Sequence, residues 1–369
     1  MRFLIAPNAY KGTFTALEAV AFVEEVLVHA YPSSQFTSQA LADGGDGTCA
    51  LISESLGLER IECLSLNAIG QSIPGFYTWE ESITTAFLDV STCSGLGILP
   101  THARQPNLTS TFGTGILIQH AIQKGAKHLI LGLGGSATID LGAGILQAMG
   151  FLFLDQNGRE IPAFSPDFLK RSRHIQRPLR LPEVSFTYLC DVRNPFFGPK
   201  GAVPVFGPQK GLQDEEIAAT EVSTADFVDL LLRKSSHPVL DQPGFGAAGG
   251  IAFGLAQFFP CSLEYGAPYF FKQVNLEEKV RQADWIITGE GKYDLQSEEG
   301  KASFELKQLA HKHGKKIALI ASGKEGNSSG FDAVLELPPV DFLVPDYKKK
   351  AREQFQGLLR EAISTKVFD

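Results

Sequence analysis

Residues 2–29, RFLIAPNAYKGTFTALEAVAFVEEVLVH, set the pattern that decides the fold. They contain a short apolar run over Arg2–Ala6, a loop over Pro7–Thr13 and an amphipathic segment over Thr15–His29. Thr15 and Glu18 have the spacing of a capping box, in which each side chain bonds the other residue's backbone N–H at a helix start. The stretch therefore predicts a strand, a glycine-containing loop and a helix.

The same order of apolar run and glycine-rich loop recurs along the chain, three times followed by a predicted helix. Helices are expected from about Thr48, near Ile145 and over Lys301–His313. Alternation of strands and helices indicates an α/β fold with a largely parallel sheet. The further strands are predicted at Gln35–Leu41, His128–Leu133, Trp285–Thr288 and Lys316–Ala321.

A second pattern interrupts this alternation and suggests a second domain. Consecutive strands are predicted at Ile61–Leu66, Gly75–Trp79 and Thr84–Val90, and Asn157-Gly158 predicts a hairpin turn. A chain of 369 residues is long enough for about two domains. Because the alternating units lie at both ends, residues 1–80 and 283–369 are expected to form one discontinuous domain. Residues 81–282 would then be an inserted α/β domain.

Composition excludes several classes of protein. The formal net charge is −8, which argues against a nucleic-acid or anionic-membrane surface. The five cysteines are widely spaced without a CxxC pair, so a disulfide framework is not expected and a cytoplasmic location fits. The longest uncharged stretch, 242–263, is glycine-rich and predicts a loop and a buried helix rather than a membrane span.

Five loops at predicted strand ends share one composition, combining glycine with a carboxylate, a lysine or both. Glycine lets backbone N–H groups approach a phosphate, carboxylates hold Mg²⁺, and lysine neutralises phosphate charge. Ligands collect at the carboxyl ends of strands in such sheets, and this mixture suits phosphoryl transfer. The loops are PNAYKG (7–12), ADGGDGT (42–48), GLGGSATIDLGAG (132–144), CDVRNPFFGPKG (190–201) and TGEGKYDLQSEEGK (288–301).

Each loop also has an ordinary interpretation. A glycine-rich loop can be a simple turn, Lys11 can be a solvated lysine, and Glu290 and Asp294 can be turn residues. Asp43 is open to either interpretation. Asp191 closes the apolar run Val184–Cys190, which places a carboxylate at a strand end.

One segment offers a different function. Residues 132–137, GLGGSA, fit the dinucleotide-binding pattern G-x-G-x-x-A, and Asp155 follows at about the spacing of a ribose-binding acid. An NAD(P)-dependent oxidoreductase is therefore an alternative, although the hairpin signal argues against a second parallel strand there. The chain contains no P-loop G-x-x-x-x-G-K-[ST] and no protein-kinase HRD or DFG set.

Taken in order, the motifs resemble those of the bacterial class I glycerate kinase family. The resemblance extends over almost the entire chain. Its strings are APNAYKGTFTALEA (6–19), LADGGDGT (41–48), TSTFGTGILI (109–118), GLGGSATIDLGAGILQAMG (132–150), CDVRNPFFGP (190–199), VFGPQKG (205–211), PGFGAAGGIAFGL (243–255) and ITGEGKYDLQSEEGKA (287–302).

The resemblance implies a specific fold and activity. It implies two α/β domains, one flavodoxin-like and one inserted, with the active site in the cleft between them. The expected enzyme is a glycerate kinase, a phosphotransferase acting on an alcohol group. It would use ATP and Mg²⁺ to phosphorylate D-glycerate, usually to 2-phosphoglycerate. No nucleic-acid or membrane partner is expected, and the chain is expected to be a monomer or a homodimer.

Two positions depart from the family's usual GGSATNDGGAG. Ile139 and Leu141 stand where Asn and Gly are usual. If the second position needs a positive φ, a leucine there is strained. A non-catalytic sensor of small anions on the same fold is therefore a further alternative.

The candidate site residues follow from the loops. Asp43, Asp191 and Lys11 are the catalytic candidates, and metal binding is assigned to Asp43, Asp191, Glu290 and Asp294. The remaining candidates would bind substrate or phosphate: Ser136, Gly134, Gly135, Asn194, Lys301, Gly289 and Gly291.

Overall fold

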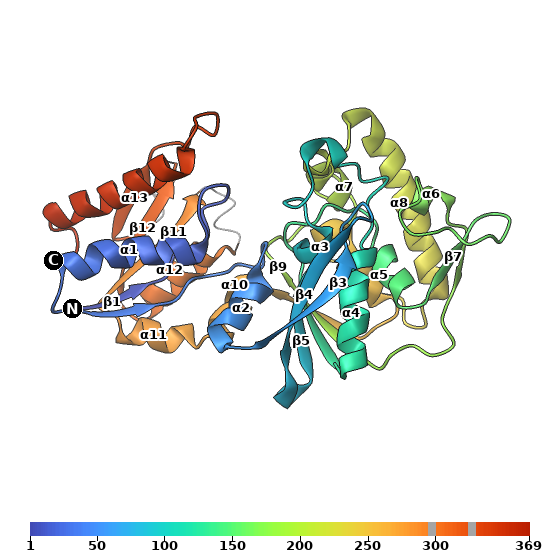
Figure 1. The fold of residues 1–369 in the computed structure, drawn as a ribbon, viewed down its shortest axis with the longest axis horizontal. Coiled ribbons are helices and arrows are strands. Elements are labelled where there is room, and N and C mark those ends of the chain that lie inside the picture. The colour runs from blue at the N-terminus through green and yellow to red at the C-terminus, as the bar shows by residue number, and fades with distance from the viewer. Residues whose placement is uncertain (294–299, 324–329) are drawn as a thin grey trace. The chain divides into compact units, whose positions relative to one another are not determined.

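The computed structural model describes residues 1–293, 300–323 and 330–369. The chain folds into two compact units. Unit 1 comprises Met1–Asp43 and Ala267–Asp369, and unit 2 comprises Gly44–Gly266. The principal helices and strands of both units are labelled in Figure 1.

Unit 1 contains a sheet of five parallel strands in the order β13-β12-β11-β1-β2. Numbered within the unit, this is the order 2-1-3-4-5 of a flavodoxin-like sheet, as expected. Phe3 lies opposite Trp285 on one side and Phe36 on the other. The bounds are β1 Arg2–Ile5, β2 Gln35–Ser38, β11 Trp285–Lys292, β12 Lys316–Ser322 and β13 Ala333–Leu337.

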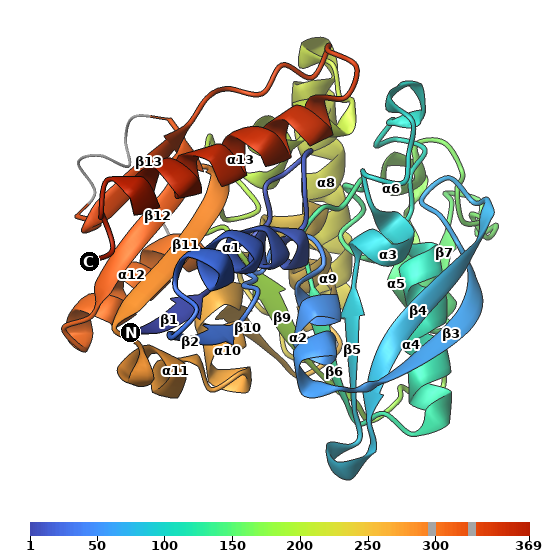
Figure 2. The same ribbon diagram turned by 60° about the vertical axis from the view of Figure 1, so that its left-hand side comes forward.

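Helices cover this sheet and bury the apolar residues of its strands. Helix α1 packs against α13, and α11 packs against α12. Figure 2 shows α1 and α13 side by side. The predicted capping box is confirmed, since Thr15 Oγ1 accepts from Glu18 N at 3.1 Å and Thr15 N donates to Glu18 Oε2 at 2.7 Å. The helices of unit 1 are α1 Ala16–Ala30, α11 Leu276–Gln282, α12 Ala302–Lys312 and α13 Tyr347–Ser364, together with α10 Gly266–Gln273, which begins at the unit boundary.

The strand order of unit 1 indicates, on physical grounds alone, where a ligand would bind. Strand β1 has neighbours on both sides that follow it in the chain, β2 and β11. The connections from such a strand leave in opposite directions, which opens a crevice at the carboxyl ends of β1 and β11. The loop from Pro7 and the end of β11 at Lys292 therefore border the expected ligand position.

Unit 2 contains a mixed six-stranded sheet in the order β10-β9-β6-β5-β4-β3. The strands β10, β9, β6 and β5 run parallel to one another, and β4 runs antiparallel to both of its neighbours, β5 and β3. The bounds are β3 Glu59–Leu66, β4 Ser72–Glu80, β5 Thr85–Asp89, β6 His128–Gly132, β9 Ser185–Cys190 and β10 Cys261–Tyr265. The helices of four or more residues are α2 Thr48–Leu56, α3 Ser91–Ser94, α4 Phe112–Lys124, α5 Ala143–Ala148, α6 Phe168–Arg171, α7 Ala202–Phe206, α8 Asp214–Lys234 and α9 Ile251–Ala256.

The division of the chain differs from the boundaries expected at 80/81 and 282/283. It falls at Asp43/Gly44 and at Gly266/Ala267. Strand β3 pairs with β4, and β4 pairs with β5, so both join the sheet of unit 2. Backbone pairing between consecutive strands therefore decides where residues 59–80 belong.

The turn at Asn157-Gly158 forms, but the main pairing there differs from a simple hairpin. A single bridge joins Leu154 to Glu160, whereas β7 Leu152–Leu154 pairs with the later strand β8 His174–Gln176. Asp155 accepts the N–H groups of Asn157 and Arg159 at 2.8 and 2.9 Å. Since β7 lies outside the six-stranded sheet and Asp155 stabilises a turn, the geometry of a dinucleotide fold is not formed here.

Two further sequence expectations concern apolar segments and cysteines. In the part of the chain that the structure describes, no helix has the length and apolar character needed to span a bilayer. The uncharged stretch 242–263 contains the short buried helix α9, as predicted. All five cysteines are free thiols.

Candidate active site

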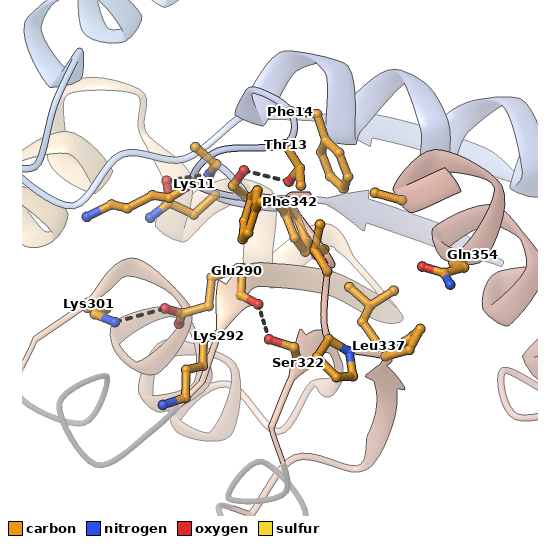
Figure 3. A pocket seen from close by; sticks show the side chains of 18 of the residues that line it. Lys11, Thr13, Phe14, Glu290, Lys292, Lys301, Ser322, Leu337, Phe342 and Gln354 are labelled. Atoms are coloured by element: carbon orange, nitrogen blue, oxygen red, sulfur yellow. Dashed lines mark hydrogen bonds and ion pairs between the residues drawn. The ribbon is translucent and has the colours of Figure 1, made fainter. Parts of the chain in front are cut away.

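A pocket of about 400 Å³ lies at the carboxyl edge of the parallel sheet of unit 1. Its walls come from the loop after β1, the ends of β11 and β12, the segment after β13, and α13. Figure 3 shows Glu290 and Lys301 facing one another at one side, with Leu337 and Gln354 at the other. This is the position that the strand order predicts for a ligand.

One end of the pocket is charged. Lys11, Asp43, Glu290, Lys292 and Lys301 all line it. Asp43 is 8% exposed, and its Oδ2 accepts a hydrogen bond from Asn8 Nδ2 at 2.9 Å. Glu290 is 4% exposed, and its Oε2 lies 3.3 Å from Lys301 Nζ. Three lysines and two carboxylates therefore line one small volume.

The electrostatics of Glu290 show how closely these charges interact. Burial raises the pKa of the Glu290 carboxyl, the ammonium of Lys301 lowers it, and the carboxylate of Asp43 raises it. Two carboxylates that disfavour each other's charge form a place where a cation is stabilised. Lys301 supplies part of that positive charge.

The other end of the pocket is apolar. Leu337, Pro338, Pro339, Val340 and Phe342 line it, and all five follow or end β13. Phe342 is 57% exposed, so this wall presents an apolar surface to solvent. An apolar wall beside a cluster of charges suits a ligand with a planar base and a polyanionic tail.

Tyr10, which lines the pocket, explains why residue 289 is a glycine. Tyr10 is buried, and its hydroxyl donates to the carbonyl of Ile320 at 2.7 Å. A Cβ on Gly289 would lie 2.0 Å from Tyr10 Oη, so glycine is required there by the tyrosine. Gly291 lines the pocket itself.

The glycines of the GLGGSA loop have a similar explanation in unit 2. A Cβ on Gly134 would lie 2.1 Å from the carbonyl carbon of Gly45, and one on Gly135 would lie 3.0 Å from Asp46 Cγ. The loop therefore packs against the backbone of residues 45–46. Close packing of two chain segments accounts for these glycines without invoking a phosphate.

Ser136, the next residue of this loop, contacts a lysine that sequence reasoning did not single out. Lys210 is 2% exposed, and its Nζ donates to Ser136 Oγ at 2.8 Å and to the carbonyl of Thr138 at 2.7 Å. Burial lowers the pKa of Lys210 to about 7, partly opposed by the carboxylate of Asp140. The only available signal was the string VFGPQKG, which carries this lysine between glycines.

Asp191 and Asn194 follow β9 in unit 2. Asp191 is half-buried. The residue before it packs tightly against Gly44, since a Cβ on Gly44 would lie 2.5 Å from the carbonyl oxygen of Cys190. Asn194 Nδ2 donates to the carbonyl of Lys200 at 2.7 Å. The Asn194 side chain therefore shapes its own loop. Asp294, the remaining predicted metal ligand, lies outside the described residues.

Leu141 has the backbone conformation that the sequence flagged as strained. Its φ is +52°, and its side chain is fully buried. Its carbonyl lies so near Gly254 that a Cβ there would be 1.8 Å from the oxygen. Ile139 is also buried and packs with Val203 and Leu212. Apolar packing accounts for both departures from the family's usual residues.

The structure therefore groups the predicted residues into separate places. Lys11, Asp43, Glu290, Gly291 and Lys301 share the pocket of unit 1. Gly134, Gly135 and Ser136 share a loop of unit 2, and Asp191 and Asn194 share another. Residues that the sequence did not single out as site residues are Asn8, Tyr10, Lys292, the apolar wall at 337–342, Gln354 and Lys210.

The carboxylates of the pocket fit a magnesium ion. Among residues 1–293, 300–323 and 330–369, no group of three or more His, Cys, Asp or Glu side chains could hold a metal alone. Mg²⁺ usually binds one or two carboxylates and completes its shell with water and phosphate oxygens. Asp43 and Glu290 supply that number of hard oxygen ligands in one pocket.

Comparison with known proteins identifies the family of the chain. The model of the glycerate kinase family matches residues 3–365. The Bacillus subtilis protein named glycerate kinase is 32% identical, covering 98% of this chain and 96% of its own length. The Escherichia coli K12 protein named glycerate 2-kinase is 34% identical, covering 91% and 90%.

A solved structure points to the same family. The Salmonella typhimurium LT2 protein assigned as glycerate kinase 2 superposes with a TM-score of 0.82 at 32% identity, covering 99% of this chain and 98% of the other. Family model, sequence relatives and fold all point the same way. The chain belongs to the glycerate kinase family and is a kinase.

Proposed function

We propose that this enzyme transfers the γ-phosphoryl group of ATP to a hydroxyl of D-glycerate, with Mg²⁺, and forms 2-phosphoglycerate. The observation that carries the proposal is the pocket of unit 1, where an apolar wall and a charged cluster meet at the carboxyl edge of a parallel sheet. Membership of the glycerate kinase family supplies the acceptor, and the pocket supplies a place for the donor.

In this proposal the nucleotide lies along the pocket. The base packs against Pro338, Val340 and Phe342, where an aromatic ring and two apolar side chains exclude water from its faces. The triphosphate extends towards Lys11 and Lys301, whose ammonium groups offset its negative charge. Binding energy from the base then holds the γ-phosphate among the charged groups.

Asp43 and Glu290 are the residues proposed to hold Mg²⁺, with Asp191 and Asp294 as further candidates. When bound, the ion would neutralise charge on the phosphate oxygens. Asn8 orients the carboxylate of Asp43 through the 2.9 Å hydrogen bond to Oδ2. Lys301 opposes the rise in the pKa of Glu290 that burial causes.

The chemical step needs an acceptor for one proton. The hydroxyl oxygen of glycerate forms a bond to the γ-phosphorus, the bond from that phosphorus to the bridging oxygen of ADP breaks, and the hydroxyl proton passes to a carboxylate. Asp43 and Asp191 are the carboxylates proposed for that proton. Ser136 is proposed to bind an anionic oxygen of glycerate.

The test is a coupled assay of ADP release with the purified chain, Mg-ATP and D-glycerate, each omitted in turn. Turnover that requires all three supports the proposal, and NMR of the product identifies the phosphorylated carbon. L-glycerate is the matched control acceptor, because it carries the same groups in the opposite configuration. ADP release that is independent of glycerate, or no turnover at all, contradicts the proposal.

We also propose that the enzyme works in a reducing compartment, the cytoplasm. The support is that all five cysteines are free thiols. A chain that pairs none of five cysteines gains nothing from an oxidising environment.

A further inference from the structure

Lys210 is held in place by its own segment. It ends the 3₁₀ helix Pro208–Lys210, and Gly211 follows with φ +98°. A Cβ on Gly211 would lie 1.9 Å from the carbonyl oxygen of Arg104, so the turn is packed tightly against that residue. The backbone that carries Lys210 therefore has little freedom to move.

The loop that Lys210 contacts is anchored on a different side. Leu96 N donates to the carbonyl of Gly135, and Ala137 N donates to the carbonyl of Ser94, each at 2.8 Å. Lys210 holds Ser136 Oγ and the carbonyl of Thr138 from residues more than 70 positions later in the chain. Residues 135–138 are thus fixed by backbone bonds from one segment and by the Lys210 Nζ of another.

Lys210 also determines whether the Ser136 hydroxyl donates or accepts in their hydrogen bond. In its protonated form Lys210 has only protons to offer, so Ser136 Oγ accepts from it in the 2.8 Å hydrogen bond. The hydroxyl's own proton then points elsewhere and can be donated. A fixed donor is what a carboxylate or phosphoryl oxygen requires from a serine.

We propose that Lys210 is a positioning residue that holds the loop 134–138 and keeps Ser136 as a hydrogen-bond donor towards an anionic oxygen of the substrate. The inference rests on the proposed function for its choice of substrate. Its structural part, the fixing of the loop by Lys210, stands independently of that function.

The experiment uses Lys210→Met, which keeps an unbranched side chain only one atom shorter and removes the nitrogen. Hydrogen exchange of the amides at 135–138 is expected to be roughly tenfold faster in the variant. Lys170→Met is the control, because Lys170 is an exposed lysine of the same unit. Unchanged exchange at 135–138 in Lys210→Met would overturn the proposal whatever the substrate proves to be.

Kinetics test the part played by Ser136. The KM for D-glycerate is expected to rise roughly tenfold or more in Lys210→Met, with the KM for ATP within about twofold, because the lost bond involves a charged donor. Ser136→Ala should give a similar rise, and the double variant should be no worse than either single one. Additive effects, or equal changes in both KM values, would contradict an action through Ser136.

Two further outcomes distinguish the positioning role of Lys210 from the choice of substrate. Lys210→Arg retains the charge and is expected to restore part of the exchange protection. If the wild type shows no turnover with glycerate while exchange at 135–138 still responds to Lys210→Met, the proposed substrate is wrong and the positioning role holds. If Lys210→Met does not fold, Ser136→Ala and Lys210→Arg carry the same comparison.

Discussion

The two units use charge in opposite ways. In unit 1, Lys11 and Lys292 are exposed and border an open pocket, beside the nearly buried carboxylates of Asp43 and Glu290. In unit 2, the buried Lys210 donates only to the chain itself.

The buried carboxylates of unit 2 follow the same rule. Asp140 accepts from Thr111 N, Thr111 Oγ1 and the N–H groups of Gly142 and Gly144. Asp89 accepts from the N–H groups of Cys49 and Ala50, at the start of α2. These groups stabilise loops, whereas the charges of unit 1 line an open pocket and are proposed to bind a charged ligand. Glycine-rich loops with acids and lysines therefore serve two purposes in one chain.

Asp43→Asn gives the largest expected effect and distinguishes a charge used for activity from one used for stability. It should lower kcat by about a thousandfold, because the carboxylate is proposed to hold the metal or accept the proton. The free energy of unfolding should change by less than about 1 kcal/mol, since an amide retains the acceptor for Asn8. Steady-state kinetics and urea denaturation measure the two quantities.

Asp284→Asn is the matched control for that variant. Asp284 is an exposed carboxylate that bonds Arg2. It lies just before β11, at the end of that strand opposite to Glu290. Its replacement should leave kcat within about twofold, because surface ion pairs contribute little. A kcat of Asp43→Asn within tenfold of the wild type would refute the role given to Asp43.

Lys210→Met gives a pH-dependent change in stability. The pKa of Lys210 is about 7 in the folded protein and 10.5 without the fold, so between these values the unfolded chain binds one more proton. The stability of the wild type relative to the variant should therefore rise by about 1.4 kcal/mol per pH unit between pH 8 and 10. Urea denaturation of both proteins at several pH values measures this, and a difference independent of pH would contradict the assignment.

Gly134→Ala tests whether packing explains the glycines of the loop. The new Cβ would lie 2.1 Å from the carbonyl carbon of Gly45, so one of the two segments must shift. A loss of about 2 kcal/mol in the free energy of unfolding is expected. Gly97→Ala is the control, since Gly97 is exposed and a Cβ there would meet nothing within 4 Å. Equal stabilities of the two variants would show that the loop is not tightly packed.

Leu141 gives the smallest expected effect and tests the strained backbone. At φ +52°, glycine is favoured over alanine, so Leu141→Gly should be more stable than Leu141→Ala by about 1 kcal/mol. Leu146 is equally buried but lies within helix α5, so there the alanine variant should be the more stable one. The same order at both positions, measured by urea denaturation, would exclude strain at Leu141.

Local patterns predicted most of the elements. The capping box of Thr15 and Glu18 begins α1 as predicted, and the apolar run before Asp191 ends as β9 at Cys190. The alternation predicted a parallel sheet, and the family resemblance implied its flavodoxin-like form. These features depend on residues close together in the sequence, which is why the sequence alone predicts them.

Long-range pairing accounts for what could not be predicted. Residues 59–80 belong to unit 2 because β4 pairs with β5, and the partner of β7 is a strand twenty residues later. Lys210 and the apolar wall at 337–342 meet their partners only after folding. No motif near Ser136 indicates Lys210 as its partner, and none near Lys11 indicates that residues 337–342 border the same pocket.

The most direct test of the account is photolabelling of the wild-type chain with 8-azido-ATP, followed by mapping of the labelled peptides. The pocket of unit 1 places the base beside Pro338, Val340 and Phe342, so the label should appear in peptides covering residues 337–354. Excess ATP should remove it, and D-glycerate alone should not. Label confined to peptides within residues 44–266, and equally displaced by ATP, would contradict the central claim that unit 1 binds the nucleotide.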